Sequence, residues 1–406
     1  MNLIITSEFR FYQTPDGDIW TPSSFPYEYW LRYLTAFENI IVIARVQLVN
    51  QSESTWSHSN GKNVSFFNLP YYVGFTGLLK NSINLFCALK EATKLKGLFL
   101  CRVPSQTASV LTFLLGKKRN YALEVVGDPY DVFSTGIGGK HLAPILKSVS
   151  KNILQKQCKN ALGASYVTES YLQKRYPAGP NTHVSFYSSI MLDKSQIIPK
   201  ARHYTEPARK LIFIGSLDQL YKAPDVLLSS FSKLFKDDKN YHLTMLGTGK
   251  FKAKLVKLAD NLGISSMVNF AGEVSSTEVE NYLQQADVFV LPSRTEGLPR
   301  AIIEAMAKGL PCVGSTAGGI PELLQPEFCI NIAKNSSLTL SLNSAQENDE
   351  KESIMQLYSS LRKLCNNTTI LNAQSKRSIS KAHEYSSEFL SIKRTHFYKK
   401  IRELNQ

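Results

Sequence analysis

Short runs of hydrophobic residues alternate with longer amphipathic stretches through the first half of the chain. The runs are typical of buried strands, and the stretches have the spacing of helices with one apolar face. Strands that alternate with helices indicate a parallel sheet with right-handed crossovers. The pattern predicts strands at residues 3–6, 40–44, 98–102, 121–126 and 164–167, and helices at residues 27–37, 80–94, 105–115 and 142–159.

The alternation lapses at residues 196–209, a polar segment that contains two prolines and that we interpret as a hinge. It then restarts and continues almost to the end of the chain. A polar stretch at residues 333–351 is interpreted as a loop. The pattern predicts further strands at residues 210–214, 241–246, 268–270, 288–291 and 311–314, and helices at residues 224–235, 251–262, 299–308, 355–364 and 388–404.

Two domains are the natural expectation for a chain of 406 residues, because a single core stops growing at smaller sizes. We expect an N-terminal domain at residues 1–195, a C-terminal domain at residues 205–385, and a terminal helix at residues 386–406 that packs back on the first domain. The expected fold class is α/β, with two doubly wound Rossmann-like domains facing each other across a cleft. Ligands of such sheets bind at the carboxyl ends of the strands.

The composition excludes several classes of protein. Hydrophobic residues make up 43% of the chain and charged residues 20%, as in globular proteins, and no run approaches the roughly 20 apolar residues of a membrane span. A short apolar N-terminus without a basic flank favours a first strand over a signal peptide, so we expect a cytoplasmic protein. The six cysteines form no CxxC pair, so neither a disulfide framework nor a zinc site is expected.

The net charge of +14 is biased toward the N-terminal half. Such a field attracts nucleic acid, anionic lipid or phosphorylated substrates. The stretch from Lys140 to Lys159 has five lysines, no acidic residue and interleaved apolar residues. Two interpretations stay open: a basic amphipathic helix that lies on anionic lipid, or a core-facing helix with solvated lysines.

The segment from Leu291 to Glu322 indicates chemistry, because it reads as strand, short loop, helix, strand and glycine turn. Gly297 would let a ligand approach the backbone, and Pro299 suits the first turn of a helix. The free amides and positive dipole end of that helix would hold a diphosphate. The carboxylates of Glu296 and Glu304 would lie near it. From these residues alone, a nucleotide site and a plain structural unit are both open.

The same segment resembles the donor-binding signature of family 4 glycosyltransferases, which are retaining enzymes of the GT-B fold. It has two glutamates eight positions apart, then Ala-Met-Ala-Lys-Gly-Leu-Pro and Gly-Gly-Ile-Pro-Glu. The resemblance implies that Glu296 contacts the donor sugar, that Glu304 contacts the ribose, and that the amides around Gly297 and Leu298 meet the phosphate.

A second match lies at residues 213–228, where the family commonly has an arginine and then a lysine that neutralise the diphosphate. Ser216 stands at the arginine position and Lys222 is retained. Loss of the arginine removes a bidentate phosphate partner, so Arg294 or Arg300 would share the charge with Lys222. Softer matches occur at residues 246–249 and 270–274. The donor-binding set implied by the resemblance is Gly215, Ser216, Lys222, Gly247, Gly272, Val274, Ser293, Glu296, Gly297, Leu298, Arg300 and Glu304.

The first half resembles, more loosely, a branch that makes bacterial surface polysaccharides. Relatives often carry a histidine after the strand that ends at Val126, where this chain has Gly127 and Asp128. Asp128 is therefore a candidate catalytic residue that orients or deprotonates the acceptor hydroxyl, although an Asp before Pro129 also starts a turn. His141 is a weaker candidate.

The resemblance implies a retaining hexosyltransferase that takes a UDP- or GDP-linked sugar and a saccharide or polyprenyl-diphosphate-linked acceptor, peripheral on the inner face of the plasma membrane. We expect no cofactor and no metal, and we interpret Asp16-Gly17-Asp18 as a loop rather than a metal-binding pair. Two alternatives stay open. One is a nucleotide-sugar epimerase of the same architecture, and the other is a basic nucleic-acid-binding protein, although no nucleic-acid motif occurs.

Overall fold

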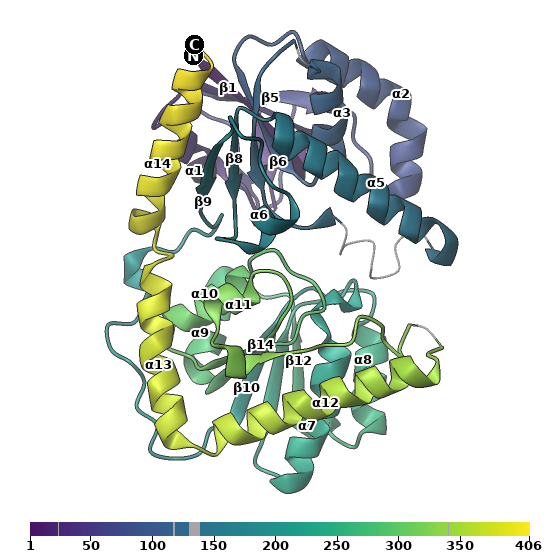
Figure 1. Ribbon diagram of the computed structural model, residues 1–406, viewed down its shortest axis with the longest axis vertical. Coiled ribbons are helices and arrows are strands. Elements are labelled where there is room, and N and C mark those ends of the chain that lie inside the picture. The colour runs from purple at the N-terminus through teal and green to yellow at the C-terminus, as the bar shows by residue number, and fades with distance from the viewer. Residues whose placement is uncertain (23, 117, 130–138, 340) are drawn as a thin grey trace. The chain divides into compact units, whose positions relative to one another are not determined.

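The computed structural model describes residues 1–22, 24–116, 118–129, 139–339 and 341–406 (Figure 1). The chain divides into two compact units. The first contains Met1–Pro129, Val149–Tyr187 and Ser391–Gln406, and the second is built mainly from Ser188–Leu390. Each unit has its own sheet covered by helices, so the expected α/β class with parallel sheets is confirmed.

The first unit contains a nine-stranded sheet in which β5, β3, β1, β6, β7, β8 and β9 are parallel neighbours. The short strand β2 pairs antiparallel with the end of β1, and β4 pairs antiparallel with β2. The register between β1 and β3 shifts between Thr6 and Arg10. The bounds are β1 (Asn2–Gln13), β2 (Ile19–Thr21), β3 (Asn39–Leu48), β4 (Ser57–His58), β5 (Val64–Leu69), β6 (Leu98–Val103), β7 (Tyr121–Val125), β8 (Gly163–Tyr166) and β9 (His183–Phe186).

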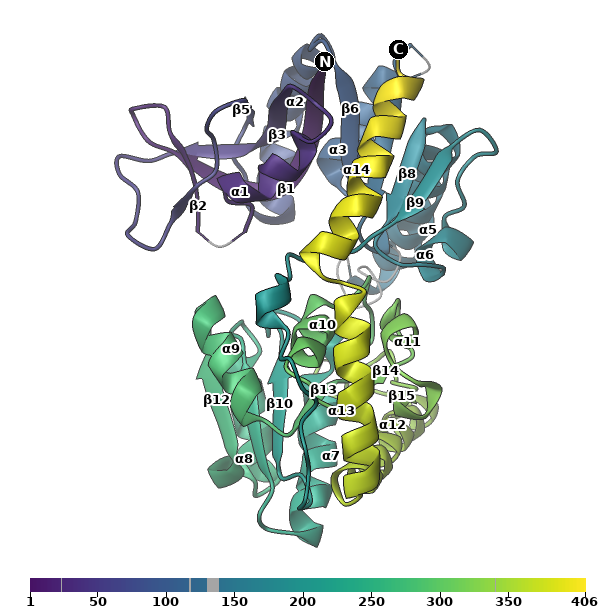
Figure 2. The same ribbon diagram turned by 90° about the vertical axis from the view of Figure 1, so that its left-hand side faces the viewer.

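Helices cover both faces of this sheet, which is why every residue of β7 is buried. Helices α2, α3 and α5 follow β5, β6 and β7 in right-handed crossovers that all advance in one direction, so they share one face. In Figure 2 they lie behind the sheet, whereas α1 and α14 lie in front. The bounds are α1 (Tyr27–Trp30), η1 (Leu31–Tyr33), α2 (Gly74–Ala92), α3 (Gln106–Leu115), α5 (Gly139–Asn160), α6 (Tyr171–Arg175) and α14 (Ser387–Leu404).

A buried carboxylate ties α14 into the first unit. Glu124 on β7 forms an ion pair with Arg102 on β6 (2.6 Å). The hydroxyls of Tyr33, Tyr187 and Tyr398 donate to the same carboxylate at 3.0–3.3 Å. Burial and then the charge of Glu124 raise the pKa of each tyrosine well above its ordinary value, so all three remain donors. Segments from the beginning, middle and end of the chain therefore meet at one buried group.

The second unit contains a six-stranded parallel sheet in the order β12, β11, β10, β13, β14, β15. Strand order reverses between β10 and β13, so the loops after these two strands diverge and leave the crevice where open α/β sheets bind ligands. The bounds are β10 (Lys210–Ile214), β11 (His242–Leu246), β12 (Val268–Gly272), β13 (Val288–Leu291), β14 (Cys312–Ser315) and β15 (Cys329–Ile330).

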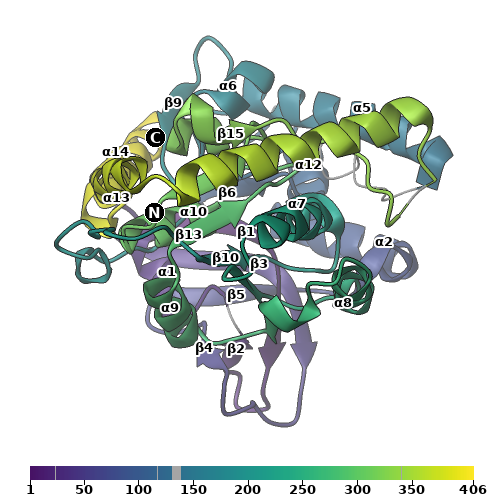
Figure 3. The same ribbon diagram turned by 90° about the horizontal axis from the view of Figure 1, so that it is seen from below.

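Helices α7 and α8 follow the strands that advance toward one edge of this sheet, and α9 and α10 lie on the opposite face. Helix α12 packs on α7, as Figure 3 shows, and α13 packs on α10. The bounds are α7 (Pro224–Asp237), α8 (Lys252–Asn261), α9 (Ser276–Gln285), α10 (Arg300–Ala307), α11 (Ile320–Leu323), α12 (Ser344–Cys365) and α13 (Thr368–His383), with short 3-10 helices at η3 (Lys194–Gln196), η4 (Leu220–Lys222), η5 (Ser265–Met267) and η6 (Pro326–Phe328).

Several predicted elements were wrong in extent. The supposed loop at residues 333–351 contains the start of α12, where Asn343 forms a reciprocal cap with Gln346. The first turns of α12 are polar on all sides, so no hydrophobic period marks them. The helix predicted at residues 27–37 shrinks to one turn followed by a 3-10 turn. Among the described helices, none is both long and apolar enough to cross a bilayer.

Candidate donor-binding site

The loop after β10 brings Lys222 over the carboxyl end of the sheet. The lysine ends the 3-10 turn η4, and the next residue, Ala223, is held in the left-handed region (φ 51°). The aliphatic stem of Lys222 lies directly across Gly215, where any Cβ would overlap Cδ of the lysine. Gly215 is therefore required for the path of the lysine toward the crevice.

The loop after β13 supplies the partner of this lysine. Nζ of Lys222 lies 2.6 Å from Oε1 of Glu296, and Ser293 Oγ donates to the same oxygen at 2.9 Å. Both charged side chains are mostly buried, with 15% of the lysine and 11% of the glutamate exposed. The two residues are 74 positions apart, yet the strand reversal between β10 and β13 makes them neighbours.

The turn after β14 contacts the backbone of the Glu296 loop and fixes its position. Gly318 adopts a positive φ of 58°, and a Cβ there would overlap the carbonyl oxygen of Glu296. The amide of Gly319 donates to the carbonyl of Gly297 at 2.7 Å. The glycine pair of the signature therefore fixes the backbone on which Glu296 stands.

Helix α10 begins beside this loop, at Arg300. Its N-cap is Pro299, one position before the first helical residue, and no side chain in the described part of the chain caps its first amides. The positive end of the helix dipole therefore faces the loop. On the next turn, burial raises the pKa of Glu304 above its ordinary value, while the charges of Arg300 and Lys222 act to lower it.

A cavity of about 330 Å³ adjoins Gly215 at the carboxyl ends of β10, β11 and β12. This size falls at the lower end of the range for small-molecule sites. The amide of Gly247 donates to the carbonyl of Gly272 at 2.7 Å and joins the ends of β11 and β12 beside the cavity. The lining residues are Ile214, Gly215, Ser216, Asp218, Leu246, Gly247, Thr248, Glu273, Val274 and Val279.

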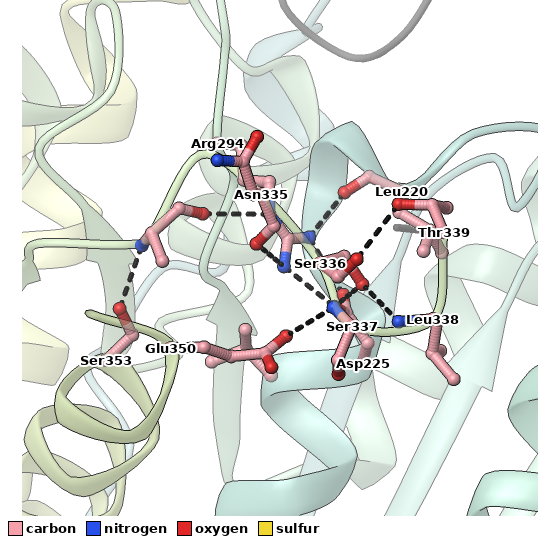
Figure 4. A network of polar contacts seen from close by, with 12 residues as sticks. Leu220, Asp225, Arg294, Asn335, Ser336, Ser337, Leu338, Thr339, Glu350 and Ser353 are labelled. Carbon is pink, nitrogen blue, oxygen red and sulfur yellow. Dashed lines mark hydrogen bonds and ion pairs between the residues drawn. The ribbon is translucent and has the colours of Figure 1, made fainter. Parts of the chain in front are cut away.

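Arg294 is not available to a phosphate in this structure. Its guanidinium forms a bidentate pair with Asp225 (2.8 and 2.7 Å), and only 3% of the arginine side chain is exposed. It also donates to the carbonyls of Leu220 and Ala333, and Ser336 Oγ donates to Asp225 at 2.6 Å. Figure 4 shows Leu220, Arg294 and Ser336 around Asp225, which lies in the first turn of α7. The sequence-based expectation that Arg294 shares the phosphate charge therefore does not hold for this conformation.

The family model for glycosyl transferases group 1 matches residues 194–361. Protein CapJ of Staphylococcus aureus is 31% identical over 326 residues, which cover 79% of this chain and 80% of CapJ. The chain belongs to the group 1 glycosyl transferases. A shorter match, 30% identical over 34% of this chain and 36% of the relative, is to a putative colanic acid biosynthesis glycosyltransferase, WcaL, of Escherichia coli.

Solved structures give the fold of this group 1 glycosyl transferase. A sucrose-phosphate synthase from Thermosynechococcus elongatus superposes with a TM-score of 0.67 over 98% of both chains at 12% identity. HepE from Anabaena, solved with UDP and glucose, superposes with a TM-score of 0.61 at 13% identity, over 100% of this chain and 97% of that one. The expected GT-B fold is therefore confirmed.

Asp128, the predicted acceptor-side residue of this glycosyl transferase, is fully engaged inside the first unit. Its Oδ2 lies 2.7 Å from Arg175 Nε, the hydroxyl of Tyr176 donates to its Oδ1, and its side chain is not exposed. A role as base would require Arg175 and Tyr176 to release it. The side chain of His141 lies outside the described residues.

The Asp16-Gly17-Asp18 segment of this glycosyl transferase forms the turn between β1 and β2. Asp16 accepts hydrogen bonds from Thr14 Oγ1 and from the amide of Asp18. Within the described ranges, no cluster of three or more His, Cys, Asp or Glu side chains is placed to hold a metal ion.

Sequence reasoning missed several residues that shape the candidate site of this glycosyl transferase. Asp218 and Thr248 line the cavity, and Asp225 anchors Arg294. The glycine pattern at residues 246–249 is the signal that could have indicated Thr248, because glycines after a strand allow close approach at the carboxyl end of the sheet. Nothing local identified Asp225, since its partner is 69 positions away.

Proposed function

We propose that this glycosyl transferase moves a hexose from a UDP- or GDP-linked donor, with retention of configuration, to a saccharide or polyprenyl-diphosphate-linked acceptor during bacterial surface-polysaccharide synthesis. The names of relatives support this proposal. WcaL is named for colanic acid biosynthesis, and AmsK of Erwinia amylovora is named for amylovoran biosynthesis. Other relatives are named as GDP-mannose-dependent, whereas HepE was solved with UDP, so the donor base stays open.

One observation carries the proposal: the Lys222–Glu296 pair lies at the strand reversal of the second sheet, beside the uncapped start of α10. A donor diphosphate placed there would meet a cation and free amides, which stabilise the negative charge that develops as the sugar leaves. Glu296, held by Ser293, would then accept hydrogen bonds from the sugar hydroxyls. Glu304, one turn into the same helix, would accept them from the ribose.

The cavity bordered by Gly215, Gly247 and Val274 is the proposed position of the nucleoside. Ser216 stands at its rim and offers a hydroxyl where relatives offer an arginine. The hydroxyl is a weaker phosphate partner, so this chain depends more on Lys222 than such relatives do. We assign no nucleophilic carboxylate, no cofactor and no metal to the reaction.

We place the enzyme at the inner face of the plasma membrane, where a polyprenyl-linked acceptor would be available. The basic helix α5 supports this location, since its described residues include Lys147, Lys151, Lys156 and Lys159 and no acidic residue. Such helices bind anionic headgroups.

The test is a thermal-shift screen of the whole chain against UDP-, GDP- and ADP-linked sugars. One donor class should raise the melting temperature, and Lys222→Ala and Glu296→Ala should each abolish the shift. Lys236→Ala and Glu347→Ala, exposed residues elsewhere in the second unit, are matched controls that should keep it.

Product analysis then separates transfer from the alternatives. Release of nucleoside diphosphate that depends on added acceptor supports transfer, whereas conversion of the donor to its epimer without an acceptor contradicts it. No shift with any nucleotide sugar would overturn the proposed site.

A further inference from the structure

The ribbon formed by the end of β1 with β2 and β4 carries a row of aromatic side chains on one face. Tyr12 on β1 lies opposite Trp20 on β2, and Trp20 lies opposite His58 on β4. Residues that are directly opposite on paired strands point to the same side of a sheet, so the three rings form one row. Trp56 and Tyr71 extend this row, since both rings lie against the ring of Tyr12. We call these five side chains the aromatic platform.

The rings of the aromatic platform are held in place by contacts with one another and with the ribbon. The ring centroids of Trp56 and Tyr12 are 4.3 Å apart in a stacked geometry, and those of Trp20 and His58 are 3.8 Å apart. The indole nitrogen of Trp20 donates to Thr14 Oγ1 at 3.0 Å, which fixes the orientation of that ring. The row crosses three neighbouring strands and so extends about 10 Å. A ligand that covers it is therefore longer than a single six-membered ring.

The opposite face of the same ribbon is packed in the core. Phe11, Ile19 and Thr21 alternate with the platform residues along the strands and are at most 3% exposed. An antiparallel ribbon with one face in the core commonly presents polar residues on the other face. Here the outer face presents rings that are each partly exposed, and 52% of the His58 side chain is exposed. A row of exposed rings, unlike a single exposed apolar residue, indicates a binding surface.

The aromatic platform lies at the end of the first sheet where ligands are expected. Residues 3–5 of β1 pair with residues 98–100 of β6, so the last residues of β1 extend beyond Val103, where β6 ends. Open α/β sheets bind ligands at these carboxyl ends. Figure 2 shows β2 and the loops around it projecting beyond the helices of the first unit. The row of rings is therefore accessible to a long ligand.

Hydrogen-bonding groups border the aromatic platform. The carboxylate of Asp18 lies 3.9 Å from the ring nitrogen of His58, and 44% of the aspartate side chain is exposed. Gln47 on β3 lies opposite Tyr12, and Arg10 lies two positions before Tyr12 on β1. Both residues are exposed and stand on the same face as the rings. The face therefore offers donors and acceptors beside flat aromatic surfaces.

These properties select a saccharide chain as the occupant. Aromatic faces carry partial negative charge and attract the polarised C–H groups on one face of a pyranose ring, while the sugar hydroxyls bond to the groups at the border. A second copy of the chain fits less well, because the row is narrow and is followed by residues 50–55, which are all polar, whereas a protein interface has a broad apolar core. A nucleic acid would bring its phosphates near the carboxylates of Asp16, Asp18 and Glu53.

We propose that the aromatic platform binds sugar units of the acceptor glycan, with Tyr12, Trp20 and Trp56 stacking on pyranose rings and Asp18 accepting hydrogen bonds from their hydroxyls. The identity of this glycan as the acceptor rests on the proposed function, whereas saccharide binding by the platform does not. The platform belongs to the first unit and shares no residue with the donor site of the second unit. An acceptor long enough to cover the platform should therefore have a lower KM than a shortened one.

Glycan-array binding of the whole chain tests the proposal, with fragments of bacterial surface polysaccharides and neutral hexose oligosaccharides as probes. The wild type should bind a subset of these probes. Trp56→Ala should weaken that binding by roughly three- to tenfold, the range expected for one stacked ring, and Trp56→Phe should retain most of it. Phe113→Ala is the matched control, since Phe113 is a ring of the same unit that is 77% exposed on α3, and it should bind as the wild type does. An unchanged melting temperature shows that each variant remains folded.

The native tryptophans report directly on occupancy of the aromatic platform. The chain has three tryptophans, of which Trp30 is completely buried and Trp20 and Trp56 are partly exposed. An aqueous quencher such as acrylamide therefore reaches mainly the two platform residues. A saccharide that binds on the array should protect this fluorescence from quenching in the wild type and in Phe113→Ala.

Acceptor kinetics separate this proposal from the proposed function. With an acceptor that binds on the array, Trp56→Ala should raise the acceptor KM and leave kcat and the donor KM unchanged. Array binding without sugar transfer would support the platform and count against the transfer reaction. Absence of any saccharide ligand, equal losses in Trp56→Ala and Phe113→Ala, unprotected tryptophan fluorescence, or a dimer that Trp56→Ala dissolves would each overturn the platform, whether or not transfer occurs.

Discussion

The ion pair of Arg294 with Asp225 is buried, so substitutions of the two residues can test whether Arg294 has a structural role or binds phosphate. Only 3% of the arginine side chain and 5% of the aspartate side chain are exposed. Arg294→Met would leave the carboxylate of Asp225 with the Ser336 hydroxyl as its remaining described partner. It would also remove the donors to the carbonyls of Leu220 and Ala333.

Breaking one partner of a buried pair costs about 3–5 kcal/mol, a large share of the free energy of unfolding of an ordinary domain. For a unit of this size the melting temperature should fall by roughly 6–20 °C. Arg294→Met/Asp225→Leu should recover most of the loss, because apolar replacement of a complete buried pair is often neutral. Differential scanning calorimetry of the wild type, both single variants and the double variant gives the coupling energy.

The stable double variant also reports on function. Arg294 holds the 3-10 turn that ends in Lys222, so the double variant should show a raised donor KM at near-normal stability. A loss of donor binding in Arg294→Met with a melting temperature within about 2 °C of the wild type would refute this reasoning. That result would mean that the arginine leaves Asp225 and serves the phosphate directly.

Other predictions concern the rim of the same site. Burial raises the pKa of Glu304 above its ordinary value of 4.5. Between the unfolded-state and folded-state pKa the folded protein binds more protons, so the free energy of unfolding falls as the pH rises through that range. Glu304→Gln should therefore have a higher melting temperature than the wild type at neutral pH and lose that gain near about pH 4. Ser216→Arg should lower donor KM by roughly tenfold through an added charge-assisted phosphate contact, measured as initial rates. Gly318→Ala should cost about 1–3 kcal/mol in urea unfolding and raise donor KM, because its positive φ and the Glu296 carbonyl exclude a Cβ. Turnover should survive exhaustive treatment with EDTA, and its loss with recovery on added magnesium would contradict the metal-free expectation.

The core strands could be predicted from the sequence, and the candidate donor signature could be found in it, because both depend on neighbouring residues. Strand β13 is a continuous apolar run, and β7 is one except for the buried Glu124, as is typical of buried parallel strands. Glu296 and Lys222 were found by a resemblance that reads short segments. What failed depends on distant partners. The guanidinium of Arg294 is neutralised by Asp225, which lies in the first turn of α7, 69 positions away, and no local pattern shows that.

Other failures have a local cause that the pattern cannot register. Helix α12 starts with residues that are polar on every side and is nucleated by the Asn343 cap, so hydrophobic spacing misses its first turns. The sequence also gives no sign that Ala223 takes a left-handed conformation, which turns the chain just after Lys222. The enclosure of Asp128 by Arg175 and Tyr176 also depends on residues more than 40 positions away, and no pattern around Asp128 shows it.

The hydroxyl of Tyr398 on the carboxylate of Glu124 has a consequence for the order of events on the ribosome. Domains usually complete in the order of synthesis. Here the first unit needs residues 391–406, which emerge only after the whole second unit has been translated. Until then Glu124 lacks one of its donors and the sheet lacks a helix on one face. We expect the second unit to mature first, and the nascent first unit to be the preferred client of chaperones.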